Sequence, residues 1–194
     1  MTTHPYPATG YTRLPWKNGS GQTDEICLLP DGASRERFEI RVSSAPILER
    51  GVFSSFPGAD RVITLIEGQG LSLEFADETL TLAPFEPQRF DSRRAPMGTP
   101  QGGPVRVVNL MADRAHWSID EARVLRGEER LDPGAGGRVF VIALNGACAV
   151  AAGGAQIALD PFDSALVEGP ATLSPARVDG TTARGIAYLL SPAG

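Results

Sequence analysis

Histidine is nearly absent from this chain, which has His4 and His116 and no other histidine in 194 residues. Neutral imidazole is the commonest side-chain ligand for metals and the commonest general base. His4 lies in the N-terminal tail and His116 in a charged stretch, and neither belongs to a segment with the pattern of a strand. The sequence therefore predicts no metal ion, no other cofactor and no histidine-activated nucleophile.

Cysteine is equally rare, because Cys27 and Cys148 are the only two. They lie far apart in the chain and lack the paired spacing of a zinc site. Each lies inside an apolar run, which is typical of a buried free thiol in a reducing compartment. We therefore expect two free thiols and no disulfide.

Long apolar runs and an excess of basic residues are also missing. No stretch reaches the roughly 18 apolar residues that a membrane span requires, and residues 1–5 (MTTHP) lack the features of a signal peptide. A net charge of −5 and a pI near 5.1 disagree with the basic surface that nucleic-acid binding requires. These absences predict a cytoplasmic protein with neither a membrane nor a nucleic acid as partner.

Glycine and proline are abundant, with 22 and 16 residues respectively, and this favours short strands joined by turns. Residues 38–43 (FEIRVS) alternate apolar and polar side chains, the period of a strand with one buried and one exposed face. Residues 68–70 (GQG) are predicted to form a hairpin turn, and residues 92–104 a long surface loop or lid. Further strands are predicted at residues 25–30, 61–67, 71–75, 80–82, 105–111 and 138–142.

A repeat links the two halves of the chain. Residues 61–86 align with residues 138–163 at an offset of 77, with a compensated one-residue slip near the central glycines. Both copies begin with Arg-Val and end with Leu-x-Pro-Phe and an acid. A unit repeated at this distance implies two similar β domains, which we expect at residues 1–112 and 113–194.

The order of strand, Gly-x-Gly, strand, turn and strand is typical of cupins. We therefore predict an all-β fold of two cupin-type jelly-roll (double-stranded β-helix) barrels, a bicupin. The position where cupins usually carry a histidine pair is occupied here by residues 56–61 (FPGADR).

Residues 15–21 (PWKNGSG) are chemically rich, since the two glycines can expose backbone N–H groups beside Lys17 and Asn18. This suits an anionic or carbonyl-bearing ligand, although a plain turn anchored by Trp16 explains the same residues. The strands add polar side chains that would make a positive barrel interior suited to a carboxylate, if they point inward. If Arg41 and Arg61 face water, no such site exists. The candidate ligand-binding residues are Lys17, Asn18, Glu25, Arg41, Arg61 and Asn109.

Several of these residues belong to a pattern that resembles the HutD/Ves family. The pattern includes PWKNG at residues 15–19, Arg41 with Ser43, FPG-x-DR at residues 56–61, and Asn109 with Met111. Ser20, Ile40 and Val107 depart from it. The resemblance implies a metal-free bicupin that forms a homodimer and has a small pocket in its N-terminal barrel. It also implies a link to histidine utilisation or to stress response.

These expectations combine into one hypothesis. Lys17 and Arg61 pair with a small carboxylate, Asn18 and Asn109 orient it, and Glu25 and Arg41 hold the cations in place. The protein would then be a sensor or accessory factor. The alternatives are a metal-independent lyase, isomerase or hydrolase that uses Lys17 or Glu25 as its acid–base group, and a purely structural or protein-binding module.

Overall fold

The computed structural model describes residues 2–15, 21–178, 181–182 and 184–194. The protein is all-β, with 61% of its residues in strands and 3% in helices. The chain forms two compact units, Thr12–His116 (the N-terminal unit) and Met1–Tyr11 together with Trp117–Gly194 (the C-terminal unit). Among the described residues, no helix is long and apolar enough to span a membrane.

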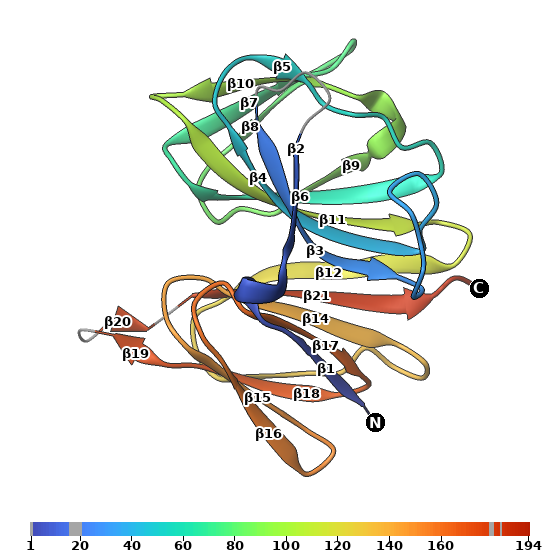
Figure 1. The fold of residues 1–194 in the computed structure, drawn as a ribbon, viewed down its shortest axis with the longest axis vertical. Coiled ribbons are helices and arrows are strands. Elements are labelled where there is room, and N and C mark those ends of the chain that lie inside the picture. The colour runs from blue at the N-terminus through green and yellow to red at the C-terminus, as the bar shows by residue number, and fades with distance from the viewer. Residues whose placement is uncertain (1, 16–20, 179–180, 183) are drawn as a thin grey trace. The chain divides into compact units, whose positions relative to one another are not determined.

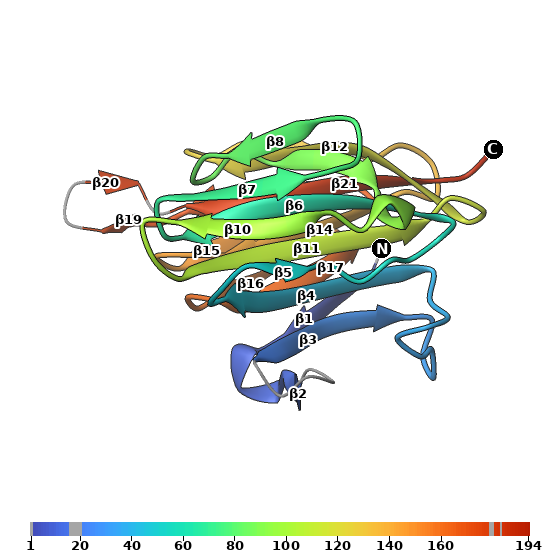
Figure 2. The same cartoon turned by 90° about the horizontal axis from the view of Figure 1, so that it is seen from above.

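The N-terminal unit consists of two antiparallel sheets (Figure 1). One sheet has the strand order β2-β3-β4-β11-β6-β9 and the other β5-β10-β7-β8. Figure 2 shows β2 and β3 at one edge of the larger sheet. The strands are β2 (Thr12–Pro15), β3 (Gln22–Leu29), β4 (Ile40–Ile47), β5 (Gly51–Val52), β6 (Ala59–Glu67), β7 (Gly70–Glu74), β8 (Thr79–Leu82), β9 (Gln88–Asp91), β10 (Met97–Gln101) and β11 (Val105–Asp113), with the short 3-10 helix η2 (Ser92–Arg94) after β9.

The core of the N-terminal unit lies between its two sheets. Ile63 and Leu65 of the larger sheet pack in one cluster with Leu71 and Leu73 of the smaller sheet. The inward side chains alternate along β6, as the period of a strand requires. All four of these leucine and isoleucine side chains are fully buried.

The C-terminal unit also has two main sheets, with strand orders β1-β17-β14-β21-β12 and β13-β18-β15-β16, and a small β19-β20 pair. The pairing of β1 with β17 places the first residues of the chain in this unit, which differs from the expected division at residues 112 and 113. The elements are β1 (Thr3–Tyr6), η1 (Ala8–Gly10), β12 (Trp117–Leu125), β13 (Glu129–Leu131), β14 (Arg138–Ala143), β15 (Cys148–Ala152), β16 (Ala155–Leu159), β17 (Ser164–Glu168), β18 (Ala171–Pro175), β19 (Arg177–Val178), β20 (Thr181–Thr182) and β21 (Gly185–Pro192).

Cys27 and Cys148 are both buried, and neither is part of a disulfide bond. Cys148 lies in the core of the C-terminal unit, which again draws on both sheets. Burial raises the pKa of the Cys148 thiol to about 11, so this thiol is protonated at neutral pH.

The two units share one strand order, because β4-β11-β6-β9 corresponds to β12-β21-β14-β17 and β5-β10-β7-β8 to β13-β18-β15-β16. The closing Leu-x-Pro-Phe motif has the same backbone in both, with positive φ of 64° at Phe85 and 71° at Phe162. The Phe85 N–H donates to the Leu65 carbonyl, and the Phe162 N–H donates to the Ala143 carbonyl. The repeat in the sequence therefore corresponds to a repeat in topology.

A β-bulge in β6 changes the register of this repeat by one residue. Opposite β11, the partner of Arg106 is Glu67 and the partner of Val107 is Leu65, so Ile66 is the additional residue. Before the bulge, Leu65 corresponds to Ala143 at an offset of 78, whereas Phe85 corresponds to Phe162 at an offset of 77. Arg61 therefore occupies the place of Val139, although the sequence alignment pairs it with Arg138.

Three local expectations are wrong. Residues 92–104 are no long loop, because they form η2 and β10, and β10 pairs with β7 along its whole length. Gly68 and Gly70 enclose no hairpin turn, since β6 and β7 belong to different sheets. The strand expected at residues 38–43 corresponds to β4, but it lacks the expected exposed face. The polar side chains Arg41 and Ser43 are as buried as the apolar side chains of this strand.

Gly68 is required by this crossing between sheets. Its φ is +103°, and a Cβ there would lie 2.6 Å from Cγ1 of Val105 and 3.1 Å from the carbonyl oxygen of Pro104. We predict that Gly68→Ala lowers the free energy of unfolding by about 1–3 kcal/mol, as measured by urea denaturation. Gly127→Ala is the control, because nothing lies within 4 Å of its Cβ position. An equal effect of the two substitutions would contradict this explanation.

Candidate functional site

Polar residues occupy two neighbouring rows across the larger sheet of the N-terminal unit. In one row Arg41, Met111, Arg61 and Phe90 are successive register partners on β4, β11, β6 and β9. In the next row Glu25, Ser43, Asn109 and Ile63 are partners on β3, β4, β11 and β6. Register partners point to the same face of a sheet.

The face that carries these rows points into the N-terminal unit, because Ile63 and Phe90 belong to its core. Arg41 and Arg61 are each 3% exposed and Asn109 is 7% exposed. The alternative that the two arginines face water is therefore wrong.

The charge of Arg41 is compensated by Glu25. The Nε atom of Arg41 lies 2.9 Å from Oε1 and 3.1 Å from Oε2 of Glu25, and Nη2 lies 2.9 Å from Oε2. The side chains are 4% and 9% exposed, so this is a buried bidentate ion pair. The guanidinium carbon of Arg41 also lies 5.3 Å from the centre of the Phe56 ring.

Arg61 has no carboxylate partner among the described residues. Its Nη2 atom donates to the backbone carbonyl of Ser54 over 3.0 Å, and its Nε atom finds no acceptor among the described residues. The rings of Phe53, Phe56 and Phe90 surround the guanidinium at 5.4–5.7 Å. Burial, with the charge of Arg41 as a smaller contribution, lowers the pKa of Arg61 to about 9. Arg61 is thus a buried cation at neutral pH.

Asn109 is a second buried group with an unsatisfied atom. Its Oδ1 atom has no hydrogen-bond partner among the described residues. Asn109 lies on β11 beside Ile63 of β6, and Arg61 is two residues away on the same face of β6. Buried polar groups in proteins are nearly always hydrogen-bonded, so two unsatisfied atoms in neighbouring rows indicate a place for a small polar molecule.

The position of Arg61 itself is apolar in the C-terminal unit, where Val139 replaces it and the adjacent inward residues of β21 are Ala187 and Leu189. Glu121 and Arg123 of β12 are the register partners of Leu189 and Ala187, and they are half-buried. Arg123 pairs with Glu121 and, at 2.9 Å, with Glu129, whereas Arg61 has no carboxylate partner among the described residues. Two of the candidate residues, Lys17 and Asn18, lie outside the described residues, so the structure tests neither.

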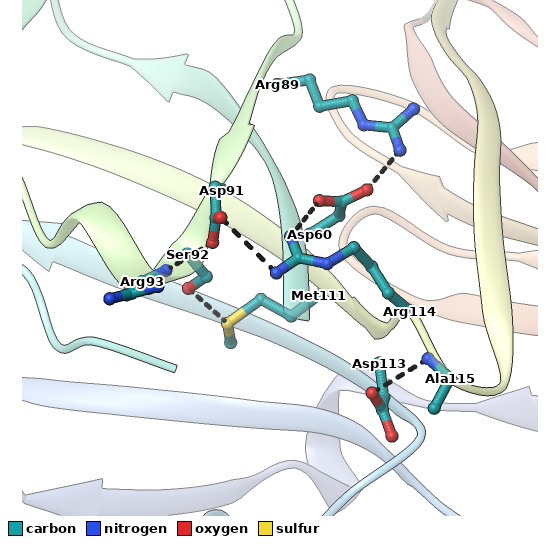
Figure 3. Close-up of polar contacts among 9 residues, drawn as sticks. All are labelled: Asp60, Arg89, Asp91, Ser92, Arg93, Met111, Asp113, Arg114 and Ala115. Atoms are coloured by element: carbon teal, nitrogen blue, oxygen red, sulfur yellow. Dashed lines mark hydrogen bonds and ion pairs between the residues drawn. The ribbon is translucent and has the colours of Figure 1, made fainter. Parts of the chain in front are cut away.

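A separate ion-pair network lies on the outer face of β6, and the sequence analysis did not identify it. Asp60 pairs with Arg89 and, at 2.8 Å, with Arg114, which also reaches Asp91 at 3.4 Å (Figure 3). Partial burial raises the pKa of the Asp60 carboxyl, but the two arginines outweigh this and hold it below its usual value. The signal for this network was the acid pair Asp60 and Asp91, which are register partners on β6 and β9.

This outer network balances two acids with two bases, so it needs no further ion. His116 makes a separate contact, with Nδ1 2.8 Å from Oδ2 of Asp113. Within the described part of the chain, no group of three or more His, Cys, Asp or Glu side chains is arranged to hold a metal ion.

A hollow of about 360 Å³ lies in the C-terminal unit, remote in sequence from every candidate residue. Residues 151–156 on the β15–β16 hairpin and residues 170–172 line it, together with Arg130. It contains none of the unsatisfied buried atoms described above, so we place the candidate site at Arg61 and Asn109.

The paired antiparallel sheets with one repeated strand order define a cupin-like β protein. A family model described as HutD matches residues 8–184, and the chain therefore belongs to the HutD family. This confirms the resemblance that the PWKNG and FPG-x-DR patterns indicate.

Solved structures agree with this assignment. HutD from Pseudomonas fluorescens SBW25, described for a formate condition, is 29% identical, with a TM-score of 0.80 and full coverage of both chains. The conserved protein PA5104 of Pseudomonas aeruginosa PAO1 is 26% identical, with a TM-score of 0.86, over 98% of this chain and 100% of that one. The Escherichia coli pirin YhhW, in complex with nickel(II), shares the fold at a TM-score of 0.68 and 8% identity, over 98% of this chain and 100% of that one.

A curated relative from Pseudomonas putida is described as an uncharacterized 21.2 kDa protein in the hutC 3' region. It is 37% identical over 105 residues, which are 54% of this chain and 55% of the relative. The match thus spans about half the length of that protein.

The buried Arg41–Glu25 pair allows a direct test. We predict that Glu25→Gln lowers the free energy of unfolding by about 3–5 kcal/mol, because it leaves the buried Arg41 charge uncompensated. Glu74→Gln, which removes the partner of Arg50 from a pair exposed at 44% and 59%, should cost no more than about 1 kcal/mol. Urea denaturation measures both. Equal losses would show that the Arg41–Glu25 pair is no more important than a surface pair.

Proposed function

We propose that the N-terminal unit binds a small carboxylate between Arg61 and Asn109, and that the protein acts as a regulatory or accessory factor. The observation that carries this proposal is the Arg61 guanidinium, which is buried without a carboxylate partner among the described residues.

The electrostatics of the interior support an anionic ligand. Isolated buried charges are strongly unfavourable unless they are paired. Glu25 is already engaged by Arg41 through both of its oxygens, so the net charge of these three side chains is +1. A carboxylate would neutralise this charge and accept hydrogen bonds from the guanidinium. A ligand donor would satisfy Asn109 Oδ1.

The relatives support the same class of ligand and a biological setting. The Pseudomonas fluorescens structure is described for a formate condition, and formate is the smallest carboxylate. The Pseudomonas putida relative is described by its position next to hutC, and the family resemblance implies histidine utilisation. We extend both features to this chain as proposals. Dimerisation and a cytoplasmic location likewise stay predictions.

The geometry of Glu25 favours binding over catalysis. A general acid or base must exchange a proton with its substrate, which requires a free oxygen within reach. The ion pair with Arg41 occupies both oxygens of Glu25. Lys17 stays in the proposal as a partner of the carboxylate, and Asn18 as an orienting group, on their chemistry alone.

The substitution Arg61→Met tests the site. We predict that it weakens binding of formate, urocanate or formylglutamate by about tenfold or more, measured by isothermal titration calorimetry, because the charged donor is lost. We also predict that the variant melts at the same temperature as the wild-type protein or about 2–4 °C higher, since a buried cation is replaced by an apolar side chain.

Arg94→Met is the matched control, because Arg94 also lies over a phenylalanine ring, that of Phe75 at 4.1 Å, but pairs with Asp77 and Glu78 at the surface. It should leave carboxylate binding unchanged. If no tested carboxylate binds the wild-type protein, or if Arg61→Met binds as well as wild type, the proposed site is wrong.

A further inference from the structure

The residues that bury Arg61 come largely from one segment outside the sheets. Residues 53–58 (FSSFPG) connect β5 to β6 and contain no strand. Phe53 and Phe56 of this segment are half-buried, whereas Ser54, Ser55 and Pro57 are exposed. The segment thus turns two aromatic rings inward and the rest of its residues to solvent.

Three contacts join this segment to Arg61. The Ser54 carbonyl accepts a hydrogen bond from Nη2 over 3.0 Å, and the Phe53 and Phe56 ring centres lie 5.7 and 5.6 Å from the guanidinium carbon. A backbone carbonyl carries only a partial negative charge, so it satisfies the geometry of the donor without neutralising the cation. The Ser54 carbonyl therefore occupies a place that an anion would fill more favourably.

The segment pairs with no strand, and its contacts with the surroundings are hydrogen bonds and ring contacts. The Phe53 N–H donates to the Pro96 carbonyl over 2.9 Å and the Phe56 N–H to the Ser92 carbonyl over 3.0 Å. The Ser55 hydroxyl donates to the Arg93 carbonyl, and the Gly58 carbonyl accepts from the Arg114 N–H, each over 3.0 Å. The Phe56 ring also packs against Phe38, with 5.8 Å between the ring centres. Segments with exposed backbone outside the sheets open locally at a lower free energy than the core.

The helix η2, which contacts residues 53–58, is more firmly held than they are. Ser92 is fully buried, and its hydroxyl contacts the sulfur of Met111 at 3.8 Å (Figure 3). Met111 is the register partner of both Arg41 and Arg61. Residues 53–58 and η2 meet at the hydrogen bond between the Phe56 N–H and the Ser92 carbonyl. Of these two segments, η2 is anchored in the core through Ser92, whereas residues 53–58 are the more loosely held.

The Phe53 ring fits into a notch that exists because residue 98 is glycine. A Cβ on Gly98 would overlap Cε2 of Phe53 and lie 3.1 Å from its Cδ2 atom. The φ of Gly98 lies outside the left-handed region, so the backbone itself accepts alanine there. The missing side chain at Gly98 thus serves to hold Phe53 against Arg61.

We propose that residues 53–58 form a removable cover over Arg61, which lifts to admit a carboxylate that then replaces the Ser54 carbonyl on the guanidinium. Gly98 is a positioning residue of this cover, because it fixes Phe53 in the closed position. The proposal concerns access to Arg61, and only the identity of the entering ligand rests on the proposed function.

The test measures access without relying on any ligand. Phenylglyoxal modifies exposed guanidinium groups, and the rate at Arg61 can be followed by mass spectrometry of peptides and normalised to exposed Arg13. We expect Gly98→Ala to label Arg61 about tenfold faster than wild type, because the alanine Cβ displaces Phe53 and shifts the cover toward its open state.

Gly51→Ala is the matched control. Gly51 is the register partner of Gly98 on β5, and nothing lies within 4 Å of its Cβ position. Its labelling rate at Arg61 should equal that of wild type. Phe53→Leu is a second variant, which keeps residue 98 intact and should also accelerate labelling because it removes the ring that covers Arg61.

The buried thiols Cys27 and Cys148 report on general loosening of the fold. Faster labelling of Arg61 with unchanged thiol reactivity supports the cover. Equal rates in Gly98→Ala, Phe53→Leu and Gly51→Ala overturn it, as does a parallel rise in thiol reactivity. Saturating sodium formate is added in a separate arm, where it should protect Arg61 of Gly98→Ala. If the cover variants label faster and formate gives no protection, the cover stands and the proposed ligand class is wrong.

Discussion

The interior of the N-terminal unit is governed by an imbalance of charge. Arg41 and Arg61 point into the same space between the two sheets, and within the described part of the chain Glu25 compensates only the first. Burial without a counter-ion is the least favourable environment for a guanidinium. The three phenylalanine rings around Arg61 lessen this cost through cation–π contacts, but they provide no full negative charge. The energetic cost of this arrangement is thus a property of the folded protein, and a bound anion would relieve it.

The sequence predicted the class of fold and most strands, because alternating side chains and glycine turns report on local geometry. It also predicted which polar residues come together, and Glu25, Arg41, Arg61 and Asn109 do share one face. The sequence did not reveal whether this face points into the unit or away from it, because an alternating pattern is compatible with both orientations. Burial does not distinguish the two faces of β4, since both are buried. Strand β10 was missed because Gly98 and Pro100 interrupt its pattern, although both residues pair with β7 in the structure.

The repeat illustrates a second limit of sequence reasoning. Its end points are correct, because the Leu-x-Pro-Phe turns of the two units have the same backbone. The shared Arg-Val start is misleading, because the bulge at Ile66 lies downstream of it. Arg61 consequently points inward, whereas Arg138 points away from its own core and lies over Trp117 at 4.6 Å. Identical residues at matching positions of a repeat thus have different environments, and only the strand register distinguishes them.

The bulge at Ile66 also bears on how duplicated domains diverge. A one-residue shift in a strand moves every side chain upstream to the opposite face. A single inserted codon can therefore change which side chains line the interior at several positions of a strand at once. In proteins built from duplicated barrels, gaps in the alignment of the two halves are consequently as informative about divergent function as substitutions.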